Sequence, residues 1–121
     1  MAQYRVTPAM ESLLDRLIPE MRRGVLQMAI LSLLADESYG YALCKNLGDK
    51  GLPTEEGTLY PILRRFEEQG LIQASWNTDG PRPRKYYQTT RRGAQLLKDM
   101  ESEWNELAGS VKKLLAKNGR S

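Results

Sequence analysis

The stretch TEEGTLYPILRRFEEQGLI, residues 54–72, has the apolar spacing of a helix, yet it carries Gly57 and Pro61 in its first two turns. A proline inside a helix removes one backbone hydrogen bond and clashes with the carbonyl four residues earlier, which costs about 3 kcal/mol. Four apolar side chains nevertheless share one stripe of the helical wheel: Leu59, Ile62, Leu63 and Phe66. This stripe predicts an amphipathic helix with one side against a core.

The two misfit residues lie roughly opposite the stripe, beside Arg64, and therefore point away from the core. Gly57 removes bulk where another surface approaches closely, and Pro61 adds a rigid apolar face. If the regular helix begins near Gly57, Pro61 falls among the first-turn amides that have no helical acceptor. Its missing N–H then costs little.

The two ends of this helix differ in charge. Its N-terminal half presents four outward or flanking residues: Thr58, Tyr60, Pro61 and Arg64. The acidic pair Glu67-Glu68 lies at the other end. A helix that docks in a major groove presents its N-terminal half to base edges and phosphates, so this polarity predicts that the four residues contact DNA. An ordinary capped surface helix is the alternative.

The chain before residue 54 predicts helices separated by breakers. Thr7 followed by Pro8 indicates an N-cap and a first helical position, and this first helix is expected to end near Pro19. Its apolar stripe comprises Met10, Leu13, Leu14 and Leu17. Pro19 is suited to open a second helix, from about 20 to 35, which is apolar nearly all round and is expected to be the central buried one.

Ser38 is expected to cap a short helix, YGYALCKNLG, that stops in the Gly48–Gly51 region. Thr54 is the expected N-cap of the quoted helix and Gly70 its C-cap. The runs LIQASW and RKYYQT then flank a turn with an Asp-Gly step and two prolines, which predicts a two-stranded hairpin. A last helix follows from about Thr90. The pattern predicts a mainly α fold with a two-stranded β-wing, a winged helix-turn-helix.

The tip of the hairpin is basic. Between Asp79 and Asp99 the sequence has no acid but six cations: Arg82, Arg84, Lys85, Arg91, Arg92 and Lys98. Cations beside Tyr86 and Tyr87 at a hairpin tip suit contact with phosphates or entry into a minor groove. The sequence therefore predicts DNA contacts from the wing residues Arg82, Arg84, Lys85 and Tyr86. A solvated loop is the alternative.

The last helix carries a heptad pattern. Six apolar residues at successive spacings of 3, 4, 3, 4 and 3 form an a/d seam: Leu97, Met100, Trp104, Leu107, Val111 and Leu114. One helix cannot bury both this seam and its core contacts alone, so the seam predicts a partner helix in a homodimer. The apolar stripe of the first helix is suited to complete the same interface. The alternative is a helix that packs only against its own domain.

Composition argues against several other functions. The chain has 121 residues, enough for one domain, and its net charge of +3 is a mild bias toward polyanionic partners. It has no histidine and no Gly-rich phosphate loop, so we expect no catalysis, no cofactor and no metal. Cys44, the single cysteine, is expected to be a small buried hydrophobe. Without a signal peptide or a membrane span, the expected location is the cytoplasm.

With these residues assembled, the sequence resembles the PadR family of bacterial transcriptional regulators. The matching stretches are RRGVLQMAILSLL, SYGYAL, EEGTLYPILRRFEEQGLI and RPRKYYQTTRRGAQLL, in the family's order over residues 22–97. The resemblance implies a winged-helix domain followed by a C-terminal dimerisation helix, which usually represses nearby genes until a small effector or a stress signal releases it. It places the recognition helix at Gly57–Pro61 with Arg64 and the wing at Pro83–Tyr87.

The sequence departs from the family in QTTRRG, where a leucine and an acidic residue are commoner than Thr89 and Arg91. This departure leaves the junction before the last helix more basic than usual. Some members of the family that the sequence resembles hold flat hydrophobic compounds between tryptophans of the dimerisation helix. The resemblance therefore implies that Trp104 contacts a small aromatic or hydrophobic effector, and the alternative is a tryptophan that only fills the interface.

The expected organisation is an N-terminal amphipathic helix at 1–19, a winged helix-turn-helix at 20–89 and a C-terminal dimerisation helix at 90–121. The expected function is a homodimeric, sequence-specific regulator, most often a repressor, that binds a pseudo-palindromic operator in double-stranded DNA. Two rivals stay open. One is a winged-helix protein-interaction module without DNA binding, and the other is a small carboxylate hydrolase, which the missing histidine disfavours.

Overall fold

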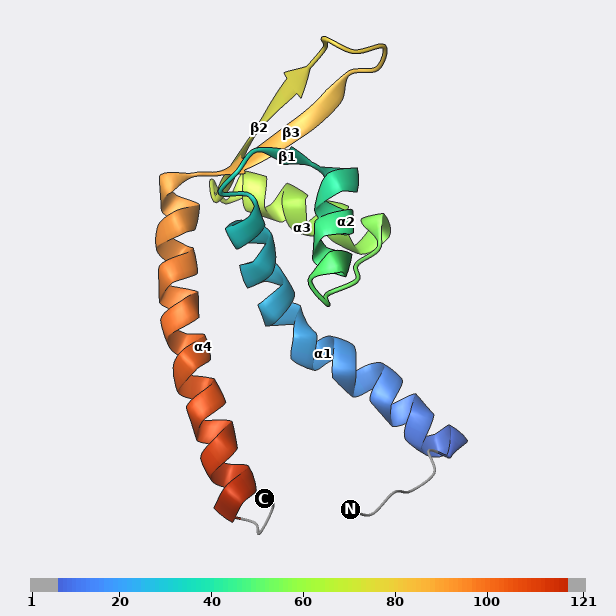
Figure 1. Ribbon diagram of the computed structural model, residues 1–121, viewed down its shortest axis with the longest axis vertical. Coiled ribbons are helices and arrows are strands. Elements are labelled where there is room, and N and C mark those ends of the chain that lie inside the picture. The colour runs from blue at the N-terminus through green and yellow to red at the C-terminus, as the bar shows by residue number, and fades with distance from the viewer. Residues whose placement is uncertain (1–6, 118–121) are drawn as a thin grey trace.

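The structure is a computed structural model that describes residues 7–117, so the expected segments at 1–6 and 118–121 lie outside it. Its elements are α1 (Pro8–Leu33), β1 (Ser38–Tyr39), α2 (Gly40–Asp49), α3 (Glu56–Glu68), β2 (Ile72–Asn77), β3 (Arg84–Thr89) and α4 (Arg91–Lys117). Figure 1 shows α2, α3 and the sheet gathered at one end of the long helices α1 and α4, with the β2–β3 hairpin projecting beyond them. The predicted mainly helical fold with a wing is confirmed.

α1 is one helix where two were expected. It starts as predicted, because the backbone N–H of Met10 donates to Oγ1 of Thr7 over 3.1 Å and Pro8 is among the first helical residues. The predicted break at Pro19 is wrong, since the helix continues to Leu33. The ring of proline fits helical backbone angles and removes a single hydrogen bond. Figure 1 shows the ribbon changing direction part-way along α1, as in other helices that accommodate a proline.

The hairpin belongs to a three-stranded antiparallel sheet in the order β1-β3-β2. The prediction of Ser38 as a helix cap is wrong, because Ser38 lies in β1 opposite Tyr87, and Tyr39 lies opposite Tyr86. α2 instead begins at Gly40 without a side-chain cap. The third strand therefore ties the start of α2 to the wing.

α3 begins at Glu56 with Glu55 as its N-cap, so the prediction of Thr54 as the cap is wrong. The Thr54 hydroxyl donates to the Leu52 carbonyl over 2.9 Å instead. The expectation that Pro61 lies among the first-turn amides is also wrong, because Pro61 follows a complete turn of helix. α3 therefore loses one internal hydrogen bond at this proline.

Both short helices end at a glycine with a left-handed backbone. Gly70 has φ +74°, and the N–H of Leu71 donates to the carbonyl of Phe66 over 2.8 Å, which is the long closure of a Schellman motif. The prediction that α3 stops at Gly70 is thus confirmed, although the C-cap residue itself is Gln69 and Gly70 follows it. Gly51, at φ +90°, follows α2 in the same way. Each closure turns a following leucine back toward the core.

An apolar core joins α1, α2 and α3 to the sheet. Its buried residues are Ile30, Leu31, Leu34, Leu43, Leu47, Leu59, Ile62, Leu63, Phe66, Leu71, Ile72 and Tyr87. All four residues of the stripe predicted for α3 are among them. α4 adds the half-buried Leu97 and Met100 at the edge of this core.

Two threonines join these elements to α4. The hydroxyl of Thr89 donates to the carbonyl of Leu31 over 2.8 Å, in the last turn of α1. The hydroxyl of Thr90 donates to the carbonyl of Gly70 over 2.6 Å and accepts the N–H of Gly93 over 3.1 Å. These bonds tie the start of α4 to the ends of both α1 and α3.

Away from the core, α1 and α4 carry large apolar side chains that the described residues leave exposed. On α1 they are Met10, Leu13, Leu14, Leu17 and Met21, and on α4 they are Trp104, Leu107, Val111, Leu114 and Leu115. Figure 1 shows the two helices diverging where these residues lie. Within residues 7–117, no helix is long and apolar enough to cross a bilayer.

Gly93→Ala should destabilise the fold even though alanine favours helices. A Cβ at position 93 would collide with the carbonyl group of Leu71, which is backbone and cannot turn aside. We expect the free energy of unfolding to fall by about 1–3 kcal/mol in urea denaturation. The control is Gly109→Ala in the same helix, where a Cβ meets nothing within 4 Å and stability should rise slightly. Equal stability of Gly93→Ala and the unchanged chain would contradict this packing.

Candidate nucleic-acid interface

The face of α3 opposite its buried stripe is open. Gly57 and Arg64 are exposed on it, and a Cβ at Gly57 would meet nothing within 4 Å. Thr58 and Tyr60 lie on the two flanks of this face. Pro61 is half-buried and lines a hollow shared with α1, so it points less directly outward than its neighbours.

Tyr60 is held in place by two neighbours. Its hydroxyl donates to Oε1 of Glu56 over 3.1 Å, one turn earlier in α3. Its ring lies against Gly40 at the start of α2, where a Cβ would collide with it. Burial, and then the Glu56 carboxylate, raise the pKa of Tyr60, so the phenol stays neutral near pH 7. α3 therefore presents a fixed, neutral ring beside the wing.

Arg84 and Tyr86 form a stack with Tyr39 of β1. The guanidinium carbon of Arg84 lies 4.4 Å from the centre of the Tyr39 ring. The rings of Tyr39 and Tyr86 meet edge to face, with their centres 5.3 Å apart. The Arg84 charge is therefore held over an aromatic face while its side chain remains exposed.

Lys85 lies on the other side of β3, because side chains alternate along a strand. Its Nζ lies 3.2 Å from Oε1 of Glu67 and 5.6 Å from the centre of the Tyr87 ring. The Lys85 side chain is 35% exposed. Lys85 thus ties the wing to the acidic end of α3, and part of its charge is already compensated. The sequence alone did not indicate this ion pair.

The turn at the tip of the wing spans residues 78–83. The backbone N–H of Asp79 donates to Oδ1 of Asn77 over 2.9 Å, a local turn that aspartate and asparagine favour. Arg82 lies later in the same connection, after this local turn, and is exposed. Within the described chain it has no ion pair and no aromatic ring beneath it. Of the wing's three cations, Arg82 is therefore the freest to meet a partner.

A hollow of about 440 Å³ lies between α3, the start of α2 and the wing. Aromatic rings and two cations line it: Tyr39, Tyr41, Tyr60, Trp76, Tyr87, Arg84 and Lys85. Trp76 and Tyr41 are 64% and 65% exposed. Neither residue was predicted from the sequence to lie in the site. The alternation of side chains along β2 could have indicated Trp76, because it places Trp76 on the same side of the strand as Ile72 but beyond the edge of the core.

Cys44 does not have the features of a reactive thiol. It is half-buried, and burial followed by the Glu56 carboxylate raises the pKa of its thiol. Nucleophilic and redox chemistry both need the thiolate, which these two effects disfavour. Its surroundings thus agree with the expectation of a small packing residue.

Two helices joined by a short loop, followed by a basic hairpin, define a winged helix-turn-helix protein. The model of the transcriptional regulator PadR-like family matches residues 30–99 of the chain. This match covers more than half of the sequence, and the chain belongs to that family.

Individual relatives support the same assignment. A PadR family transcriptional regulator from Eggerthella lenta is 45% identical, with a TM-score of 0.84 over 90% of this chain and 97% of that one. A transcriptional regulator from Mycobacterium tuberculosis is 33% identical over 93 residues, which cover 76% of this chain and 87% of the relative. PadR of Bacillus subtilis, solved in complex with operator DNA, is 29% identical with a TM-score of 0.57. That match covers 62% of this chain and 45% of the other.

Proposed function

We propose that the chain is a sequence-specific DNA-binding transcriptional regulator that reads a major groove with α3. The observation that carries the proposal is the open outer face of α3 beside an aromatic and cationic wing. The family relationship supports it, because the structure of the Bacillus subtilis relative contains that protein in complex with operator DNA. Repression of nearby genes, relieved by a small effector, is the mode of action that the family resemblance favours. Binding to chromosomal DNA would place the protein in the cytoplasm.

In this proposal α3 supplies the base contacts. Arg64 has donors for a guanine edge, and Tyr60 offers a fixed ring and hydroxyl at the same end of the groove. Thr58 and Pro61 border the contact on the side of α1. Gly57 lets the DNA approach the first turn of α3 because no side chain stands between them.

The wing supplies contacts to the DNA backbone. Arg82 and Arg84 are exposed cations for phosphates, and Tyr86 holds the stack that carries Arg84. We expect Lys85 to contribute less to the attraction of DNA phosphates, because its charge is already paired with that of Glu67. The exposed rings around the neighbouring hollow, those of Trp76 and Tyr41, are suited to pack against sugars between two grooves.

We also propose that the chain forms a homodimer through the exposed faces of α1 and α4. On α4 the proposed seam comprises Leu97, Met100, Trp104, Leu107, Val111 and Leu114. Leu97 and Met100 already contact the core, whereas the other four are exposed and need a partner. Two copies related by a two-fold axis would read two half-sites, which implies a pseudo-palindromic operator.

Trp104 is the proposed contact for a flat aromatic or hydrophobic effector. It lines a hollow of about 350 Å³ between α1 and α4, where Glu101 is the one charged residue. The alternative is a tryptophan that only fills the dimer interface.

The main rival for the whole chain is a winged-helix module that binds protein. Its binding would not follow the length and salt dependence of a nucleic acid.

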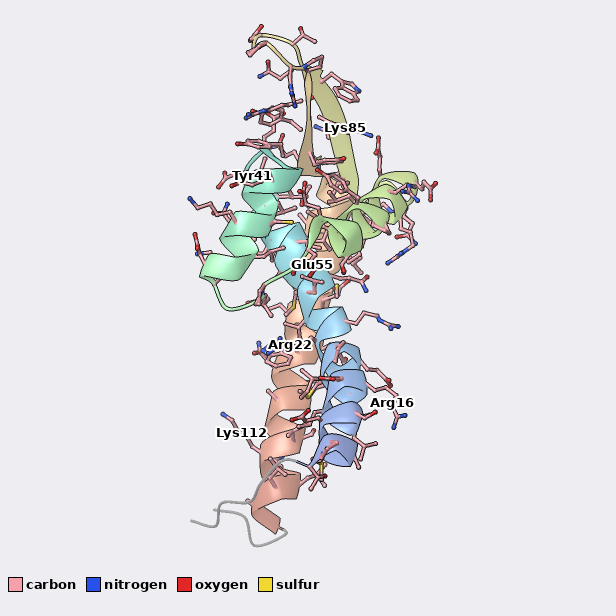
Figure 2. All side chains as sticks on the ribbon, turned by 90° about the vertical axis from the view of Figure 1, so that its right-hand side faces the viewer. Arg16, Arg22, Tyr41, Glu55, Lys85 and Lys112 are labelled. Carbon is pink, nitrogen blue, oxygen red and sulfur yellow. The ribbon has the colours of Figure 1, made fainter. Side chains whose placement is uncertain are left out.

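A gel shift with the DNA upstream of the protein's own gene tests the function. Binding should weaken steeply with salt, and Arg82→Ala should flatten the plot of log affinity against log salt by about 1. Lys85→Ala should flatten it less, because Glu67 shares that charge. Figure 2 shows Lys112 near the opposite end of the molecule from Lys85, so Lys112→Ala is the matched control with an unchanged slope. No retardation at any salt concentration would reject the DNA-binding function.

Gly57→Ala should change stability and DNA binding in opposite directions. Alanine favours the helix, and its methyl group has open space, so the free energy of unfolding should rise by about 0.5 kcal/mol. The same methyl group would stand between α3 and the groove and lower the affinity for DNA. Gly109→Ala, on α4 off the proposed seam and with nothing within 4 Å of a Cβ, should stabilise without affecting DNA binding. Unchanged DNA affinity in Gly57→Ala would remove α3's first turn from the interface.

Leu107→Asp should dissociate the dimer. In a single chain Leu107 is 53% exposed, so a carboxylate there costs the monomer little. In a dimer seam the same carboxylate would be buried without a partner, which is strongly unfavourable. Sedimentation should show monomers and the gel shift a loss of operator affinity, whereas Ser110→Asp, off the seam, should remain dimeric. An intact Leu107→Asp dimer would show that the copies associate through another surface.

A further inference from the structure

The hydroxyl proton of Tyr60 is held within the protein. The Tyr60 oxygen lies 3.1 Å from Oε1 of Glu56, one turn earlier in α3. A carboxylate only accepts hydrogen bonds, so the phenol is the donor in this pair. Burial, followed by the hydrogen bond to Glu56 and the charge of Glu56, raises the pKa of Tyr60, so the proton is present near neutral pH. A phenol has a single O–H, and this one points at Glu56.

The oxygen of the same hydroxyl keeps its capacity to accept. A phenol oxygen accepts hydrogen bonds through its lone pairs while it donates its proton. Within residues 7–117, the bond to Glu56 is the one hydrogen bond that this hydroxyl makes. Tyr60 is 39% exposed and lines the open hollow between α2, α3 and the wing. The Tyr60–Glu56 pair therefore offers acceptors, and no donor, to a molecule that contacts this part of α3.

The contact with α2 keeps the ring in this position. α2 and α3 pack on each other, and Figure 1 shows α2 crossing α3 near the N-terminal end of α3. The tip of the Tyr60 ring occupies the space that a Cβ at Gly40 would need. Contacts with both Gly40 and Glu56 restrict the rotation of the ring, so the hydroxyl cannot readily turn its proton toward another partner.

An oxygen that only accepts distinguishes bases in the major groove by their exocyclic groups. Adenine and cytosine present amino groups there, which donate, whereas guanine and thymine present carbonyl oxygens, which accept. Phosphate oxygens also accept, and the Glu56 carboxylate repels their charge. The Tyr60–Glu56 pair is therefore complementary to the amino group of adenine or cytosine and mismatched to guanine, thymine and phosphate.

We propose that Tyr60, with its proton held by Glu56, reads the amino group of one adenine or cytosine in the operator and rejects guanine and thymine at that position. Tyr60 makes the contact, and Glu56 is the positioning residue that fixes its polarity. The inference rests on the proposed function, because it requires α3 in the major groove. It specifies the sequence change that this contact detects, which is a transition from adenine to guanine or from cytosine to thymine. Rejection arises because two acceptors that face each other repel.

Glu56 should lower affinity and raise selectivity at the same time. Its charge lies near a polyanion and weakens the attraction to any DNA sequence. Without this carboxylate, the phenol proton is free to turn toward a guanine or thymine oxygen, or toward a phosphate. Removal of Glu56 should therefore raise affinity for DNA in general and relax the discrimination between bases. A merely structural role would lower both.

Binding-site selection from a pool of randomised duplexes, followed by gel shifts, tests the contact with the full-length protein. The unchanged protein should select adenine or cytosine at a position where Tyr60→Phe, which keeps the ring, selects neither. A transition at that position should weaken binding of the unchanged protein about tenfold and leave Tyr60→Phe nearly unaffected. A duplex that lacks only the amino group, with purine for adenine or 2-pyrimidinone for cytosine, should give the same contrast.

Glu56→Ala tests the positioning role. This variant should bind random duplexes more tightly, and its discrimination against the transition should fall from about tenfold to about twofold. Glu55→Ala is the matched control, because Glu55 is the adjacent residue with the same charge and makes no side-chain cap hydrogen bond in α3. It should bind all duplexes more tightly and keep the tenfold discrimination. In the Tyr60→Phe background, Glu56→Ala should not change discrimination further.

Three results would overturn the inference while DNA binding stands. They are full discrimination in Glu56→Ala, an equal loss on every duplex in Tyr60→Phe, and selection of guanine or thymine at the position that Tyr60→Phe relaxes. The second result would make the hydroxyl a phosphate contact, and the third would make it a donor to a base. A protein that retards no duplex of the pool would reject the proposed function, and this inference with it.

Discussion

Burial of one face of α3 is the constraint on which the rest of the structure depends. Gly57 and Pro61 weaken the intrinsic helicity of this segment, so the helix relies on packing its apolar stripe against α1, α2 and the sheet. Once that stripe is inside, the opposite face with Arg64 must be outside. The wing lies beside that face because β1 and β3 pair next to the start of α2.

Cations of similar sequence context have different surroundings in the fold. Arg82 is free in the described chain, Arg84 lies on the Tyr39 ring and Lys85 pairs with Glu67. An exposed pair such as Lys85–Glu67 contributes little to stability, about 0–1 kcal/mol, but it lowers the charge available to a phosphate. Local contacts therefore set how much each cation can give to a polyanionic partner.

The unbroken α1 connects three features that a break at Pro19 would have separated. Its C-terminal turns lie in the core, its middle borders α3 with Arg22 and Arg23, and its N-terminal half carries the exposed apolar stripe. A rigid helix transmits a change of angle along its length, whereas a flexible joint would absorb it. This continuity connects the proposed dimer face to the core that supports α3.

The sequence by itself determined the features that depend on neighbours along the chain. These are the stripe of α3, its end before the left-handed Gly70, the hairpin and the long last helix, because helical period and glycine conformation are local properties. Only the tertiary structure decided that α1 runs through Pro19, that Ser38 is a strand residue and that Lys85 meets Glu67. It also brought Trp76 beside Tyr60 and the arginines of α1 beside α3. Each of these depends on residues far apart in sequence, whose contacts no local pattern encodes.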